Sequence, residues 1–131
     1  MRKLILLLGV ISLAACNNDS TSPNGNVTGT YTLRTVNGNP LPYTFSDGSV
    51  LVSDHLSLNS DGSYQDVATF NNGSRNETGF WSINNNLITF NDQTDPGNLS
   101  YNGSVSGSVL TETFPDQSQF NASITEVYQK D

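Results

Sequence analysis

The feature that most constrains this 131-residue chain is the regular spacing of turn dipeptides between short runs of β-branched and aromatic residues. From residue 28 onward, an Asn, Asp, Pro or Ser followed by Gly recurs at 37-38, 47-48, 61-62, 72-73, 96-97 and 106-107. Such dipeptides are typical of tight turns between antiparallel strands. No segment shows helical spacing, and the many Asn, Ser and Thr residues disfavour helix interiors. The sequence therefore predicts an all-β domain, with strands near 28-36, 50-59, 63-70, 77-84, 87-92, 98-106, 109-114 and 119-129 and a short one at 41-45.

The turns also predict which side chains share a face of the sheet. Loops at 60-62, 85-86 and 107-108 set the cross-strand pairs, which we expect to be Leu58–Tyr64, Leu56–Asp66, Val52–Phe70, Ile83–Ile88, Trp81–Phe90, Val105–Leu110 and Tyr101–Phe114. A longer loop at 115-119 would bring Phe120, Ala122 and Ile124 alongside. The apolar members fall on one face, and His55 falls on the opposite face among Ser, Thr, Asn and Gln.

One apolar face across eight main strands, with short loops and no helices to cover it, requires the sheet to curl or to split. A closed, antiparallel up-and-down meander β-barrel of about eight strands is the simpler solution. Tight turns join sequential neighbours, and closure removes exposed sheet edges. Such a barrel encloses packed side chains or one small ligand. A β-sandwich is the alternative fold.

Three short segments resemble a known family. Residues 29-33, GTYTL, look like the Gly-x-Trp opening of lipocalins and fatty-acid-binding proteins, with Tyr31 at the tryptophan position. Residues 56-64 and 79-83, LSLNSDGSY and GFWSI, are similar to the hairpins of bacterial lipocalin-like domains, which are small lipoprotein barrels. The resemblance covers residues 28-129 and implies a lipocalin-like barrel.

The first sixteen residues indicate export. Arg2 and Lys3 precede an apolar run at 4-13 that is too short to span a bilayer as a mature helix. Residues 13-16, LAAC, resemble the bacterial lipobox, whose cysteine receives a diacylglycerol, becomes the first residue after cleavage and is N-acylated, with palmitate as a typical chain. Cys16, the only cysteine, is therefore the expected lipidation site and membrane anchor. The alternative is an ordinary secretory signal with an incidental cysteine.

This interpretation divides the chain into a signal peptide at 1-15, the lipidated Cys16 with a flexible polar tether at 16-27, and a barrel domain at 28-131. The expected location is the bacterial cell envelope. Asn17 follows the cysteine where Asp favours inner-membrane retention in enteric bacteria. The resemblance thus favours the outer membrane, facing the periplasm or the cell surface.

Charge and residue inventory exclude several functions. After cleavage, Arg34, Arg75 and Lys130 stand against twelve acidic residues, so the surface would repel nucleic-acid phosphates. His55 is the only histidine, and Cys16 is consumed by lipid, so histidine-based zinc sites and Ser/His or Cys/His nucleophilic pairs lack parts. We expect no catalysis, no metal and no cofactor.

The unusual feature of the apolar face is that Asp54, Asp66, Glu112 and Glu126 fall on it. Buried carboxylates are costly unless paired or hydrated, so one interpretation places them near the barrel mouths or invokes a local register slip. The other is a partly acidic pocket for an amphipathic or cationic molecule, with room left by Gly103 and Ala122 beside Glu112. The candidate ligand-binding residues are Tyr31, Leu33, Leu56, Tyr64, Trp81, Phe90, Tyr101, Glu112 and Phe114.

Two functions from different classes remain open. An envelope lipoprotein of this kind would bind a small apolar or amphipathic molecule inside its barrel. Alternatively, a barrel with a filled core would serve as a protein-interaction or inhibitor module of the envelope, using its outer face or its loops. An open cavity favours the first function, and a filled interior favours the second.

Overall fold

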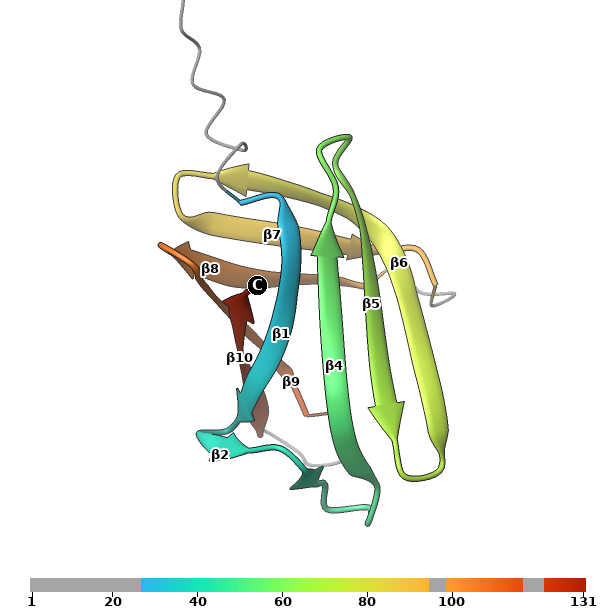
Figure 1. Ribbon diagram of the computed structural model, residues 1–131. Coiled ribbons are helices and arrows are strands. Elements are labelled where there is room, and N and C mark those ends of the chain that lie inside the picture. The colour runs from blue at the N-terminus through green and yellow to red at the C-terminus, as the bar shows by residue number, and fades with distance from the viewer. Residues whose placement is uncertain (1–26, 95–98, 117–121) are drawn as a thin grey trace, which may run out of the picture.

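The strands lie close to the expected positions. The computed structural model describes residues 27–94, 99–116 and 122–131 (Figure 1). Its strands are β1 (Gly29–Val36), β2 (Asn39–Pro40), β3 (Tyr43–Thr44), β4 (Val50–Leu58), β5 (Ser63–Phe70), β6 (Gly73–Asn84), β7 (Leu87–Asp92), β8 (Ser100–Ser106), β9 (Val109–Pro115) and β10 (Ser123–Lys130). Among these described residues, no helix is long and apolar enough to cross a membrane.

Strand pairing closes the sheet into a barrel. Each strand from β4 to β10 pairs antiparallel with the next along the chain, β1 pairs with β10, and β1 also pairs with β4. Within the described residues, β1 and β4 to β10 therefore form a closed eight-stranded meander, and the short β2 and β3 extend from β1 and β4. The expected closed, antiparallel up-and-down barrel is confirmed. The sandwich alternative is wrong, because the β1–β4 ladder joins what would be its open edges.

Most of the expected register is present. The pairs Leu58–Tyr64, Leu56–Asp66, Ile83–Ile88, Trp81–Phe90 and Val105–Leu110 all occur. The β8–β9 ladder stops at Asn102–Thr113, one residue short of the expected Tyr101–Phe114 pair, yet those two rings meet with centroids 6.2 Å apart. Ile124 lies alongside β9 as expected, directly opposite Phe114, and Phe120 lies outside the described residues.

The expected Val52–Phe70 pair is wrong. Leu51 faces Phe70 instead, because a β-bulge between Leu51 and Ser53 adds one residue to β4. The bulge reverses the local alternation, so that Leu51 is buried and Val52 is 49% exposed. Beyond the bulge the register is the expected one, and Asp54 points inward.

The positions of two turns explain where β5 and β6 begin. The β4–β5 turn uses Gly62 at a φ of 85°, and the Gly62 N–H donates to the Asn59 carbonyl at 3.1 Å. The next hairpin turns at residues 71-72 rather than at 72-73, since Phe70 faces Gly73. As a result β6 begins at Gly73, ahead of the expected residue 77.

One end of the barrel interior is packed. Its buried apolar side chains include Tyr31, Leu33, Leu56, Trp81 and Phe90. The Trp81 indole N–H donates to the Asn59 carbonyl at 3.1 Å. Val27, expected at the end of the tether, is also buried, and its carbonyl accepts a 2.6 Å hydrogen bond from the Tyr31 hydroxyl. This packing leaves the other end of the interior for the site.

Candidate functional site

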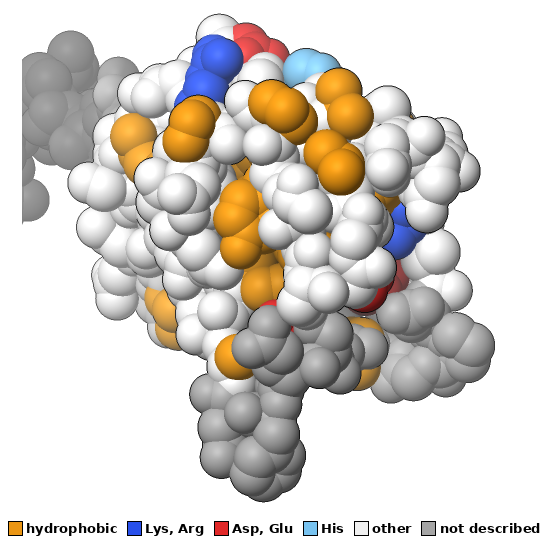
Figure 2. All heavy atoms as spheres, turned by 90° about the horizontal axis from the view of Figure 1, so that it is seen from below, with side chains coloured by type: hydrophobic (Ala, Val, Ile, Leu, Met, Phe, Trp, Pro, Cys, Tyr) orange, Lys and Arg blue, Asp and Glu red, His pale blue; other side chains and the backbone are white. Residues whose placement is uncertain are grey.

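A cavity of about 490 Å³ lies inside the barrel. Its walls come from the beginning of β4, β6, β8 and β10, the end of β5, β7 and β9, and the loop before β4. Most of these segments lie toward the end of the barrel at the bottom of Figure 1, and the end of β7 and the beginning of β8 lie higher, at the right. Figure 2 views this end and shows hydrophobic side chains across its middle, with acidic and basic side chains between the polar residues. The lining residues are Phe45, Asp47, Ser49, Leu51, Asp54, Asp66, Ala68, Phe70, Arg75, Glu77, Asp92, Leu99, Ser100, Tyr101, Glu112, Phe114, Pro115, Asp116, Ile124 and Glu126.

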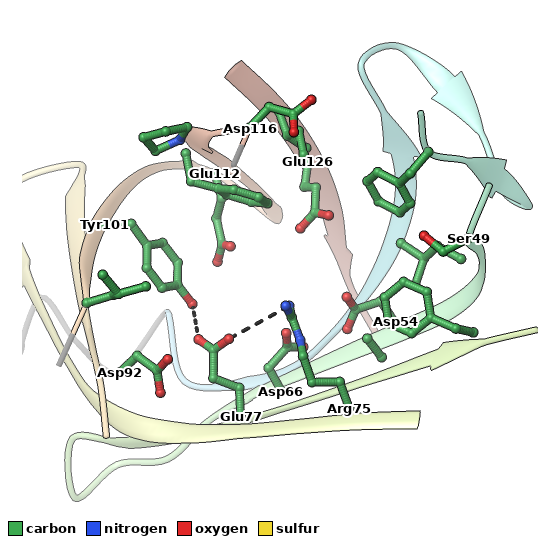
Figure 3. Close-up of a pocket in the computed structure, with 18 of the residues that line it drawn as sticks. Ser49, Asp54, Asp66, Arg75, Glu77, Asp92, Tyr101, Glu112, Asp116 and Glu126 are labelled. Atoms are coloured by element: carbon green, nitrogen blue, oxygen red, sulfur yellow. Dashed lines mark hydrogen bonds and ion pairs between the residues drawn. The ribbon is translucent and has the colours of Figure 1, made fainter. Parts of the chain in front are cut away.

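Strand alternation delivers carboxyl groups from six strands, β4 to β7, β9 and β10, into this cavity. Asp66 on β5 lies directly opposite Glu77 on β6, and Glu112 on β9 lies directly opposite Glu126 on β10. Asp54 on β4 joins them around one space (Figure 3). Like charges in directly opposed positions destabilise a sheet, so a core selected only for stability would not contain them.

Glu77 is the best-paired carboxylate of the group. Its Oε1 accepts hydrogen bonds from the Tyr64 hydroxyl at 2.8 Å and from the Tyr101 hydroxyl at 2.9 Å. Its Oε2 lies 3.8 Å from the Arg75 guanidinium, an ion pair at the cavity wall (Figure 3). Glu77 is thus held in place from two sides.

The Tyr128 hydroxyl lies between two carboxyl groups that line the cavity, those of Asp54 and Glu126. Its oxygen is 3.0 Å from Glu126 Oε2 and 3.3 Å from Asp54 Oδ2. A hydroxyl has one proton to donate, so it serves only one of these carboxylates at a time. One of the two carboxylates, Glu126 or Asp54, is therefore always without a hydrogen bond from Tyr128.

Three buried carboxyl oxygens have no hydrogen-bond partner in the part of the chain that the structure describes. They are Asp54 Oδ1, Asp66 Oδ1 and Glu112 Oε1, on side chains that are 2%, 7% and 3% exposed. Unpartnered buried polar atoms are rare in folded proteins and each one costs free energy. Their concentration around one space marks this cavity as a functional candidate.

Burial also changes the acidity of these groups. Desolvation, followed by the neighbouring Asp54 carboxyl, raises the pKa of Asp66 well above its ordinary value. Desolvation and the facing Glu126 likewise raise the pKa of Glu112. Desolvation and Asp54 raise the pKa of Glu126 to about 7, against the opposing hydrogen bond from Tyr128. At neutral pH the cavity wall therefore retains protons that exposed carboxyl groups would have released.

The structure divides the nine candidate ligand-binding residues between the cavity and the core. Tyr101, Glu112 and Phe114 line the cavity. The other six, Tyr31, Leu33, Leu56, Tyr64, Trp81 and Phe90, are buried in the packed end and are not part of the lining. Stacked and edge-to-face rings connect the two regions, with centroid distances of 5.2 Å for Tyr64–Phe90 and 5.0 Å for Phe90–Tyr101. Tyr101 therefore lies at the boundary between core and cavity.

The expectation that Gly103 leaves room beside Glu112 is wrong. A Cβ atom at Gly103 would lie 2.7 Å from the Thr111 carbonyl oxygen and 3.1 Å from Ile88 Cγ2. Gly103 does lie opposite Glu112 on β9. The close packing around it leaves no room for a side chain. Ala122 is not among the lining residues. The open space lies nearer the barrel end, beside Ala68 and Ile124.

Sequence reasoning missed several lining residues, chiefly Arg75, Glu77, Asp92, Phe45 and Phe70. Arg75 and Glu77 share the alternation of Gly79 and Trp81, so starting the strand at residue 73 would have placed both on the inner face. Phe45 belongs to a loop, and no periodic signal marks its side chain as part of a cavity. Cys16 lies outside the described residues.

The acidic group is not arranged as a metal site. In the ranges 27–94, 99–116 and 122–131, no three His, Cys, Asp or Glu side chains form a group that could hold a metal ion. His55 lies on the outer face as expected, with its Nδ1 3.3 Å from the Thr32 hydroxyl.

Comparisons relate the chain to known proteins. A family model described as a lipocalin-like domain matches residues 27–111. Among solved structures, the fatty-acid-binding protein isolated from Manduca sexta is similar at 13% identity and a TM-score of 0.41, over 78% of this chain and 97% of that chain. No curated protein matches the sequence significantly.

Proposed function

Because the chain belongs to the lipocalin-like domain family, we propose that its barrel binds a small amphipathic molecule in the cavity at one end. The observation that carries the proposal is the cavity itself, about 490 Å³ with aromatic, aliphatic and carboxyl groups in its wall. This volume is in the range that small-molecule sites occupy. The mixed lining suits a ligand with one apolar part and one polar group. The alternative of an interaction module with a filled core lacks this support.

We also propose that Cys16 carries lipid and attaches the protein to a bacterial envelope membrane, with the outer membrane as the favoured site. The support is the charged, apolar and small-residue order of residues 1-16, which ends at this cysteine. The barrel would then capture or carry its ligand near the membrane surface. We propose binding without catalysis, since the only histidine faces outward and the only cysteine is the anchor.

Two measurements test ligand binding. Native mass spectrometry of the protein purified from its own host should detect a bound small molecule. Titration with the neutral fluorophore N-phenyl-1-naphthylamine should give saturable binding to the purified protein. Saturable binding that the cavity variant below abolishes would support the proposal.

The cavity variant is Ala68→Leu, which adds bulk to a buried lining residue. Its matched control is Val67→Leu, which changes the next residue of β5 on the opposite face. We expect the Ala68 variant to lose probe binding and the control to retain it, with both folded by circular dichroism. Equal binding by both variants would place the probe outside the cavity and contradict the proposal.

A further inference from the structure

We propose that the ligand carries a positively charged group, such as an ammonium, that binds among the carboxyl groups of Asp54, Asp66 and Glu112. Its apolar part would lie toward the barrel end. This inference rests on the proposed function and specifies the chemical class of its ligand.

The first observation is the charge of the cavity wall. Acidic side chains line it from β4, β5, β6, β7, β9 and β10, and Arg75 is the basic residue among the described lining. A carboxylate head group entering this space would pair with Arg75 but would lie among acidic side chains, whose ionisation it would oppose (Figure 3). A cationic head group would instead favour the ionised form of these side chains and pair with them.

The second observation is independent of the overall charge. Asp54 Oδ1, Asp66 Oδ1 and Glu112 Oε1 are buried in the wall of this one cavity without a hydrogen-bond partner among the described residues. A cation with N–H groups would supply three donors at once, and a quaternary ammonium would supply charge alone. The unpartnered oxygens therefore fit an ammonium better than an alcohol or an acid.

The third observation is that Arg75 already places a cation at this wall. Its guanidinium lies 3.8 Å from Glu77 and points into the cavity between the acidic groups (Figure 3). The side chain is 62% exposed, so it is free to rearrange when a ligand enters. Arg75 pairs with Glu77 and leaves the buried oxygens of Asp54, Asp66 and Glu112 without a partner.

The apolar part of the ligand has a suitable wall near the barrel end. Phe45 and Phe70 lie 6.3 Å apart between ring centroids. Phe114 on β9 and Ile124 on β10 lie opposite each other in their ladder and also line the cavity. The polar oxygens lie deeper than these rings, so the ammonium would enter first.

Cation binding should be coupled to proton release. The ionisable groups of the lining are Asp47, Asp54, Asp66, Arg75, Glu77, Asp92, Tyr101, Glu112, Asp116 and Glu126. The Tyr128 hydroxyl contacts Asp54 and Glu126 from outside the lining. Burial raises the pKa values of Asp66 and Glu112 and raises the pKa of Glu126 to about 7. An ammonium would favour the ionised carboxylates, so its affinity should increase as pH rises from 6 to 8.

The test compares three ligands that share one alkyl chain. Dodecylamine, dodecanol and dodecanoate are titrated calorimetrically into the purified protein at pH 8, below their micelle-forming concentrations. Dodecylamine remains an ammonium at this pH, since alkyl amines titrate near the lysine value. We expect it to bind roughly tenfold or more tightly than the other two. Titration of Ala68→Leu under identical conditions corrects for partition into detergent or lipid.

The outcomes separate this inference from the proposed function. Dodecanol or dodecanoate binding as tightly as dodecylamine, and lost in Ala68→Leu, would overturn the cationic ligand and leave the proposed function in place. Failure of all three ligands to bind would overturn both.

A charge variant gives a second test. Glu112→Gln should weaken dodecylamine binding about fivefold or more and leave dodecanol binding unchanged, because it removes charge with little change of shape. Asp61→Asn is the matched control, since Asp61 lies in the β4–β5 turn, outside the lining. Equal weakening of both ligands by Glu112→Gln would assign Glu112 a structural role and contradict its role in cation binding.

Discussion

Glu112 and Glu126 lie directly opposite each other on β9 and β10, and both side chains are buried in the barrel. Such a pair repels when both members are ionised, and burial adds a desolvation penalty. The expected consequence is that the folded protein holds protons on this wall up to and beyond neutral pH. Its stability and its ligand binding should both depend on those protons.

We predict that the protein loses stability as pH rises from about 5 to 8. The pKa values of Asp66, Glu112 and Glu126 are raised in the folded state by burial, so the folded state binds protons more tightly than the unfolded state. The free energy of unfolding therefore falls as pH rises above the ordinary carboxyl pKa values. For Glu126 this fall ends above its folded pKa of about 7. Urea denaturation at several pH values measures this slope. A free energy that rises across the same window would contradict it.

We predict that Glu112→Gln stabilises the protein at pH 8 by about 1 kcal/mol or more. The amide has no charge to desolvate, and it removes the repulsion from Glu126. The gain should shrink as pH falls and disappear at about pH 3, below the ordinary Glu pKa of 4.5, where Glu112 is protonated in both the folded and the unfolded state, and comparison of the two pH values is the internal control. A variant less stable than the parent at pH 8 would show that the ionised carboxylate has a partner.

We predict that Trp81→Ala costs about 3–5 kcal/mol of unfolding free energy. Trp81 is buried opposite Phe90, and its indole N–H donates to the Asn59 carbonyl. Trp81→Phe should cost less, because the ring contact with Phe90 is kept. Chemical denaturation measures both variants. Native tryptophan emission typical of a water-exposed indole would contradict this placement.

We predict that substitution of Leu51 costs much more stability than substitution of its neighbour Val52. Leu51→Ala should cost about 2–5 kcal/mol, because the side chain is buried opposite Phe70. Val52→Ala should cost about 0.5 kcal/mol or less, because Val52 is on the outer face at the bulge. Denaturation of the matched pair tests the bulge itself. If Val52→Ala cost more than Leu51→Ala, the strand would have no bulge and Val52 would face Phe70.

We predict that Cys16→Ser yields an uncleaved precursor without lipid. The lipid is attached through a thioether, which requires the cysteine sulfur. Serine has a hydroxyl oxygen in its place. Intact-mass measurement of the membrane fraction compares the variant with the parent. A mature variant of the same mass as the parent would contradict lipid attachment at Cys16.

Much of the fold follows from local patterns that the sequence carries directly. Alternation and tight turns determine β strands and hairpin register, so the Trp81–Phe90 and Leu56–Asp66 pairs could be predicted from residues close together in the chain. The same alternation placed Asp54, Asp66, Glu112 and Glu126 on the inner face, where the structure has them.

Only the tertiary structure decided where the interior is open. The bulge at Val52 is a backbone irregularity that the apolar pattern of β4 does not reveal. The β1–β4 ladder joins strands that do not follow each other in the chain, and it brings the acidic groups of six strands around one space. Sequence alone therefore determined most of the residues that face inward, with Val52, Arg75 and Glu77 as exceptions. Closure and packing determined that the aromatic residues fill one end while the carboxyl groups line a cavity at the other, because these depend on contacts between distant strands.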